Sequence, residues 1–180
     1  MAELRRIYID TCCFIDLVRV ELGHTLTTDK QNDAWHVKKL LEANRDGEVT
    51  MFTSTLTIAE CRHAGANVQV TDAVKSQFTR LLMSGQYVRL VQMTPFIAQD
   101  ARDLTWKHGV SLKGADSIHV ASALDRKCDE LLSGDGRIRR LGEVGGALAS
   151  LGLATREARD TKSLPEKYRQ LELGDGQAIH

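Results

Sequence analysis

Short apolar runs alternate along the chain with longer segments in which apolar residues recur every three or four positions. The short runs lie at residues 7–9, 49–52, 87–91, 131–132 and 151–155, and their β-branched and apolar content predicts strands. The longer segments lie at residues 11–20, 31–45, 57–65, 71–84, 95–108 and 115–127, and they predict helices with one apolar face. Residues 21–30 are polar and rich in threonine, so we expect a loop there.

The order of these elements determines the predicted fold class. Helices separate the first four strands, so these strands are too far apart to pair as hairpins. Such an order is typical of an α/β protein with three α/β/α layers and a mostly parallel central sheet. We expect residues 1–155 to form one domain, and the charged residues 156–180 to form a peripheral helix and a flexible tail.

Composition and charge narrow the function classes only slightly. The chain has 24 basic and 24 acidic residues, so its net charge neither favours nor excludes nucleic acid binding. No apolar run has secretory character or approaches the ~18 residues of a membrane span, which predicts a cytoplasmic protein. No C-x-x-C pair occurs among Cys12, Cys13, Cys61 and Cys128, so we expect buried, reduced thiols and no zinc site.

Four acidic residues occupy informative places in the predicted elements. Asp10 directly follows the first strand, and Asp135 follows the fourth after a Ser-Gly turn. Glu60 lies on the helix after the second strand, and Asp116 lies in the first turn of the helix at 115–127. The carboxyl ends of parallel strands meet at one edge of a sheet, where such folds bind their ligands. We therefore expect the four carboxylates to converge at that edge.

Each acid taken alone also has a structural explanation. Asp10 could cap the next helix, and Asp116 could complement its helix dipole. Asp135 could serve turn formation, and Glu60 could be a solvated helix residue. The joint placement favours a site, because converging carboxylates repel one another and need a cation. Oxygen ligands suit Mg²⁺ or Mn²⁺, which activate water and neutralise phosphate charge, so the pattern predicts hydrolysis of phosphodiesters.

Four segments resemble the successive motifs of the PIN-domain family. They read IYIDTCCFIDL, STLTIAECRHA, GADSIHVASAL and LLSGDGRIRRL, and the resemblance extends over roughly residues 5–155. The resemblance implies a PIN-like α/β/α fold and a nuclease that cleaves RNA with Mg²⁺ or Mn²⁺. Many bacterial members are toxins of the VapC type, which a small antitoxin inhibits. Residues 21–34 and those beyond 155 exceed the usual length of these toxins.

The resemblance also implies roles for individual residues. The catalytic and metal-binding residues would be Asp10, Glu60, Asp116 and Asp135, acting directly or through water. Thr11 and Ser133 would hydrogen bond these carboxylates or the water around the ion. The implied partners are an RNA substrate, a small antitoxin and a second copy of the chain, which would pair through the helices at 31–45 and 71–84.

Several further residues carry weaker signals. Contacts with a nucleic acid backbone are expected from Lys113, Arg137, Arg139 and Arg140. His119 follows Asp116 by three positions, but we expect it to pack in the interior. The alternatives are a catalytically silent PIN-like RNA-binding or interaction module and a nuclease directed at DNA. A HAD-type phosphatase is disfavoured, because Cys12 stands where that class needs a second aspartate.

Overall fold

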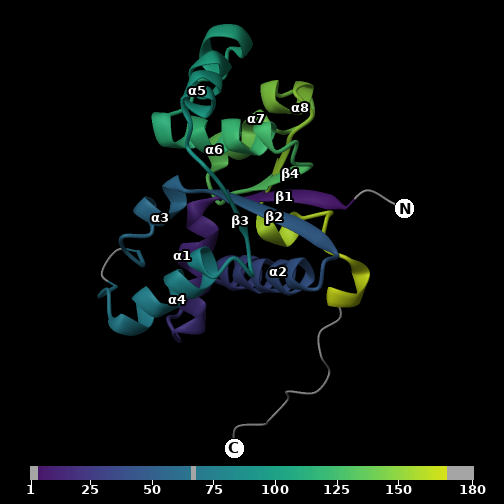
Figure 1. Cartoon of the computed structure of the whole chain (residues 1–180). Coiled ribbons are helices and arrows are strands. Elements are labelled where there is room, and N and C mark those ends of the chain that lie inside the picture. Colours follow the sequence, from purple (N-terminus) through teal and green to yellow (C-terminus); the bar gives the residue numbers. More distant parts are fainter. Residues whose placement is uncertain (1–3, 66–67, 170–180) are drawn as a thin grey trace, which may run out of the picture.

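Five parallel strands form the central sheet of the computed structural model, which describes residues 4–65 and 68–169 (Figure 1). The strands are β1 (Arg5–Ile9), β2 (Val49–Ser54), β3 (Arg89–Val91), β4 (Glu130–Leu132) and β5 (Ala154–Arg156). Their order in the sheet is β3-β2-β1-β4-β5, and every pairing is parallel. The predicted α/β class is therefore confirmed.

Helices cover both faces of this sheet (Figure 1). One face carries α1 (Thr11–Glu21), α2 (Thr28–Arg45) and α4 (Asp72–Met83). The other carries α5 (Pro95–His108), α6 (Gly114–Asp125), α7 (Gly136–Leu141) and α8 (Ala147–Ser150). The short helix α3 (Leu56–Glu60) follows β2 directly. None of the described helices combines the length and apolar character that crossing a bilayer requires.

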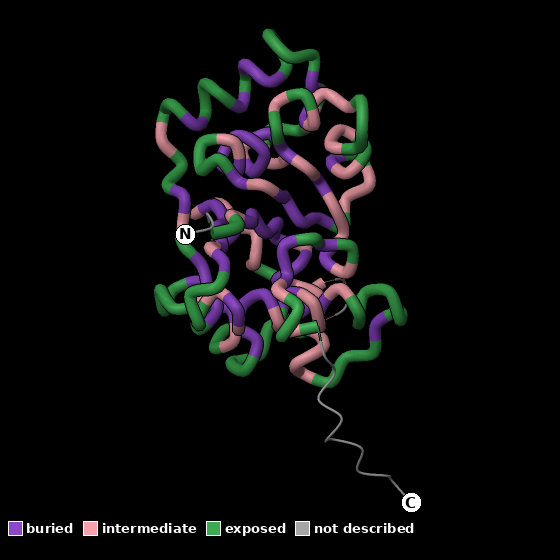
Figure 2. The backbone as a smooth tube through the Cα atoms, turned by 90° about the vertical axis from the view of Figure 1, so that its right-hand side faces the viewer, coloured by how far each residue is buried: buried purple, intermediate pink, exposed green. Residues whose placement is uncertain are grey.

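The alternating side chains of β1 divide the interior into two cores. Ile7 and Ile9 pack with the apolar residues of α1, α2 and α4. Tyr8, between them in sequence, points to the other face and packs against α5 and α6. Buried residues are therefore found on both sides of the sheet (Figure 2). Because β1 is buried on both faces at the centre of the sheet, the position directly after it is well fixed.

Two helix boundaries differ by three or more residues from those expected. Helix α2 begins at Thr28, three residues before the expected start, and Asp29 in its first turn complements the helix dipole. Helix α3 ends at Glu60, well before Gly65. Ala64, beyond this early end, is completely buried, so the chain turns back to the core instead of continuing the helix.

The described part of the C-terminal segment forms a strap across α2. It holds two 3-10 turns, η1 (Ala158–Asp160) and η2 (Glu166–Tyr168), so the predicted peripheral helix is wrong for residues 156–169. Pro165 restricts the residue before it and interrupts any helix there. Ala158 and Leu164 are buried in the same core as α2. Residues 170–180, where we expected a flexible tail, lie outside the described residues.

Polar contacts fix the strap at both ends. Arg159 forms an ion pair with Asp33 of α2 at 2.8 Å. The Tyr168 hydroxyl donates a hydrogen bond to Asp46 at 2.7 Å. The strap therefore covers part of α2, one of the two helices expected to pair with a second copy.

Candidate active site

A pocket of about 500 Å³ opens at the carboxyl edge of the sheet, where β1 ends. Its lining consists of Asp10, Thr11, Cys12, Ile15, Ala59, Glu60, Arg62, His63, Asp116 and Asp135. The pocket thus brings together the four acids singled out from the sequence. They come from the end of β1, from α3, from α6 and from the turn after β4.

Asp10 is the most buried of the four acids, with 8% of its surface exposed. It precedes α1 as the N-cap residue, and its Oδ1 accepts a hydrogen bond from the Thr11 backbone N–H at 2.7 Å. Its Oδ2 accepts from the Ser133 hydroxyl at 2.6 Å, across the boundary between β1 and β4. The capping role and the position in the pocket therefore belong to the same carboxylate.

Glu60 is held by two donors on its Oε2 atom. The Thr11 hydroxyl donates at 2.5 Å, and His119 Nε2 lies 2.7 Å away. The hydrogen bond from His119 is the main reason that the pKa of Glu60 lies below its usual value. Glu60 is therefore ionised at neutral pH, although its side chain is only 30% exposed.

His119 is buried, as expected, but the sequence did not reveal its hydrogen bonds. Its second ring nitrogen, Nδ1, lies 2.8 Å from the hydroxyl of Tyr8, so both ring nitrogens have partners. Burial alone would lower the pKa of His119, but the hydrogen bond with Glu60, followed by the nearby carboxylate charges, outweighs it, and the pKa is raised. The spacing of three between Asp116 and His119 was the available signal, because it places both on one side of α6.

Asp135 and Asp116 share one cation, the guanidinium of Arg137. Asp135 is the N-cap of α7 and accepts from the Arg137 backbone N–H at 2.7 Å. Nη2 of Arg137 lies 2.5 Å from Asp135 Oδ2 and 3.3 Å from Asp116 Oδ2. This contact lowers the pKa of Asp135, whereas burial raises the pKa of Asp116.

The donor set of the pocket fits a hard divalent cation, because its converging ligands are carboxylate oxygens. Across residues 4–65 and 68–169, however, no three Asp, Glu, His or Cys side chains close around a common point. Each acid is held by a partner from the protein: Asp10 by Ser133, Glu60 by His119, and Asp116 and Asp135 by Arg137. Side-chain rotations would be needed to bring the carboxylates around one ion.

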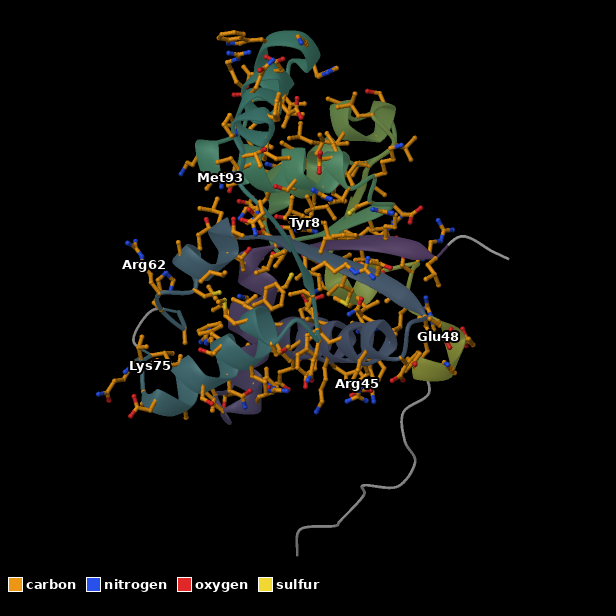
Figure 3. The ribbon with its side chains drawn as sticks, viewed as in Figure 1. Tyr8, Arg45, Glu48, Arg62, Lys75 and Met93 are labelled. Atoms are coloured by element: carbon orange, nitrogen blue, oxygen red, sulfur yellow. The ribbon has the colours of Figure 1, made fainter. Side chains whose placement is uncertain are left out.

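The basic residues expected to contact nucleic acid differ in their exposure and in their partners. Lys113 and Arg140 are exposed, at the start of α6 and near the end of α7. Arg139 instead forms an ion pair with Glu157 at 2.9 Å. The sequence did not single out Arg62 and His63, which line the pocket just after α3 (Arg62 is labelled in Figure 3). Only their position close after Glu60 in the sequence could have indicated that they line the pocket.

The cysteines agree only in part with the expectation of buried thiols. All four are free, and Cys13 and Cys128 are buried. Cys12 is half-buried and lines the pocket, where its thiol donates to Asp10 Oδ2 at 3.4 Å. The side chains after Asp10 turn with α1, so adjacent cysteines face different surroundings.

The structure resembles solved toxin–antitoxin structures at low sequence identity. One is VapBC2 from Rickettsia felis bound to a DNA fragment from its promoter, with a TM-score of 0.54, 12% identity, and coverage of 84% of this chain and 98% of that chain. Another is FitAcB from Neisseria gonorrhoeae, with a TM-score of 0.49, 18% identity, and coverage of 86% and 99%. The likeness to VapBC2 shows a shared fold.

Sequence comparison supplies the family. Curated protein sequences give no match to the chain. The PIN domain family model matches residues 7–144, which is more than half of the chain and includes all four acids of the pocket. The chain belongs to the PIN domain family.

Proposed function

We propose that the protein is a Mg²⁺- or Mn²⁺-dependent ribonuclease that hydrolyses phosphodiester bonds at Asp10, Glu60, Asp116 and Asp135. The observation that carries this proposal is the pocket at the carboxyl edge of the sheet, which all four acids line. Membership of the PIN domain family supports it, because PIN domains are generally nucleases. A pocket lined by four acids suits a charged, metal-bridged group better than an apolar ligand.

The four carboxylates would hold the ion directly or through water. A bound ion lowers the pKa of an attacking water and neutralises charge on the phosphodiester. The surrounding residues of the protein orient the carboxylates. Ser133 fixes one oxygen of Asp10 at 2.6 Å, and Thr11 fixes one oxygen of Glu60 at 2.5 Å. Such supporting hydrogen bonds prevent the carboxylates from rotating freely.

Basic side chains near the pocket support a nucleic acid substrate. Arg62, Lys113 and Arg140 are exposed, and Arg62 lies on the pocket lining itself. Phosphate contacts of this type supply affinity without sequence preference, so they do not distinguish RNA from DNA. We propose RNA as the substrate on the strength of the family resemblance alone, and the choice is part of the test below.

We also propose that a small antitoxin and a second copy of this chain are partners. The solved VapBC2 structure has a fold similar to this one, and it motivates the antitoxin. Because the strap covers part of α2, we propose that the dimer forms through α4. Its Met83 is 59% exposed beside an apolar groove that includes Ile58 and Val70. Sedimentation of the protein, alone and with the product of the neighbouring gene, measures both associations.

The nuclease proposal is tested by incubating the purified protein with RNA and DNA of the same sequence. Cleavage of RNA should require Mn²⁺ or Mg²⁺ and should stop in excess chelator. Asp10→Asn should reduce the rate by about two orders of magnitude or more. Asp16→Asn is the matched control, because Asp16 lies on α1 but pairs with Lys30 at 3.0 Å and is not part of the pocket lining.

Each outcome separates the alternatives. Cleavage that survives chelation would refute the metal mechanism. Cleavage of DNA but not RNA would make the protein a deoxyribonuclease, whereas binding of RNA without metal-dependent cleavage would favour a silent binding module. Equal loss in the Asp10 and Asp16 variants would mean that the pocket is not the active site.

A further inference from the structure

Arg137 holds the two carboxylates on one side of the pocket together. Its Nη2 atom bridges Asp135 and Asp116, which come from different elements. All three side chains are partly accessible, with 49% of Arg137, 22% of Asp116 and 28% of Asp135 exposed. Asp116 has no other hydrogen bond or ion pair among the described residues. Arg137 is therefore the cation that compensates this side of the acidic pocket.

The Arg137 guanidinium lies where a metal ion would have to bind Asp116 and Asp135. Two carboxylates that converge on a guanidinium have their oxygens directed at that cation and not at a common ion. A guanidinium stays charged at every pH a protein tolerates, so it cannot leave by losing a proton. A divalent ion within a few ångströms of it would be repelled. An ion that binds Asp116 and Asp135 must therefore displace the Arg137 side chain.

The local structure allows this displacement without unfolding. The backbone of Arg137 is anchored by its N–H bond to the capping Asp135, at 2.7 Å. The next residue, Ile138, is 1% exposed and fixes α7 against the core. The Arg137 side chain is long and half-exposed, so it can rotate into solvent while the helix stays in place.

We infer that Arg137 is a built-in competitor of the metal ion. In the metal-free protein it neutralises Asp116 and Asp135, and it leaves them when the ion binds, so it lowers the metal affinity of the site. This inference rests on the proposed metal site. If Arg137 only held the carboxylates in a binding-ready arrangement, its removal would weaken metal binding, whereas removal of a competitor strengthens it.

The test measures Mn²⁺ binding by titration calorimetry in the full-length protein and its variants. Arg137→Gln should bind Mn²⁺ about three- to tenfold more tightly than the unmodified protein. The matched control is Arg126→Gln, because Arg126 pairs with Asp125 at 2.8 Å at the opposite end of α6. That variant loses a similar exposed pair and should keep the original Kd within about twofold.

A second readout is the melting temperature without metal. Arg137→Gln leaves the acidic cluster uncompensated, so it should melt earlier than the unmodified protein in chelator, and Mn²⁺ should close the gap. If this variant does not fold, Arg137→Lys keeps the charge but loses the planar two-donor contact. Its Kd should fall in the same direction by a smaller factor.

The outcomes distinguish this inference from the proposed function. An unchanged or weaker Mn²⁺ affinity in both Arg137 variants, with Mn²⁺ still bound by the unmodified protein, overturns the competitor role alone. Mn²⁺ binding by neither the unmodified protein nor the variants overturns the metal site, and the competitor role with it. Equal tightening in Arg126→Gln would show a general charge effect and would also overturn the inference.

Discussion

The Nε2 atom of His119 lies 2.7 Å from Oε2 of Glu60, which ties the interior of α6 to the short helix α3. Through Nδ1, the same ring reaches the hydroxyl of Tyr8 in the central strand at 2.8 Å. A buried histidine thus connects the sheet, one helical layer and an acid of the pocket. Because the ionised carboxylate of Glu60 can only accept, Nε2 carries a proton. The neutral Nε2–H tautomer and the charged form both satisfy the two contacts, since the Tyr8 hydroxyl can donate to Nδ1 or accept from it.

Removing this connection should destabilise the protein. His119→Ala leaves the Tyr8 hydroxyl, which is fully buried, without its partner and opens a cavity between β1 and α6. We expect the free energy of unfolding to fall by about 2 kcal/mol or more, measured by urea denaturation. His24→Ala, in an exposed loop, is the control and should change it by less than about 0.5 kcal/mol. A similar small change in His119→Ala would mean that the buried contacts contribute nothing.

The contribution of His119 should depend on pH. Its pKa is raised in the folded protein above the ordinary value of 6.5. A histidine of this kind stabilises the fold fully below its unfolded pKa, and the contribution is lost as the pH rises through the folded pKa. In chelator, the difference in unfolding free energy between the unmodified protein and His119→Gln should therefore be larger at about pH 6 than at about pH 9. A difference that grows with pH would reverse the assigned direction.

Two substitutions at Asp10 should separate its capping role from its role in the pocket. Asp10→Asn keeps an oxygen for the Thr11 backbone N–H and a polar group beside Ser133, so the melting temperature should stay the same or rise. Asp10→Ala removes the cap and should cost about 1 kcal/mol of unfolding free energy. Both should abolish cleavage. A large loss of stability in Asp10→Asn would show that the charge itself is structural.

Asp116 and Asp135 should differ in how much cleavage depends on them. We expect Asp116→Asn to reduce the cleavage rate at least as much as Asp135→Asn, since Asp135 also caps α7 and is neutralised more closely by Arg137. The test is to measure the single-turnover cleavage rate of each variant at saturating Mn²⁺. Full activity in Asp116→Asn would remove that residue from the site.

The acids of the pocket could be located from the sequence because strand ends are well marked. Asp10 and Asp135 follow short apolar runs, and parallel strands bring such ends to one edge. The partners of these acids could not be located in the same way. Helix α7 has six residues, and Ile138 is its only buried one, so no apolar period reveals the helix that positions Arg137. The pairing of Arg137 with Asp116 depends on how α6 and α7 pack, which local sequence does not encode.

The strap shows a second limit of sequence patterns. Its buried apolar residues, Ala158 and Leu164, are separated by polar residues without a helical or strand period. Their burial follows from the apolar surface that α2 presents. The ion pair of Arg159 and the hydrogen bond of Tyr168 instead depend on the carboxylates Asp33 and Asp46, near the two ends of that helix. Periodicity detects elements that pack along their length, whereas a strap packs at isolated points.

The position of β1 in the sheet determines when during synthesis the pocket can form. β1 is the first strand to be made, yet it pairs on one side with β4, and β4 needs β5 beyond it. The Ser133 hydroxyl, which fixes Asp10, is therefore available only after translation has passed residue 133. At translation rates of 5–20 residues per second, that delay is on the order of ten seconds. A nascent chain that does not yet include β4 and Ser133 has no assembled pocket, so any cleavage activity can arise only after that part of the chain has been made.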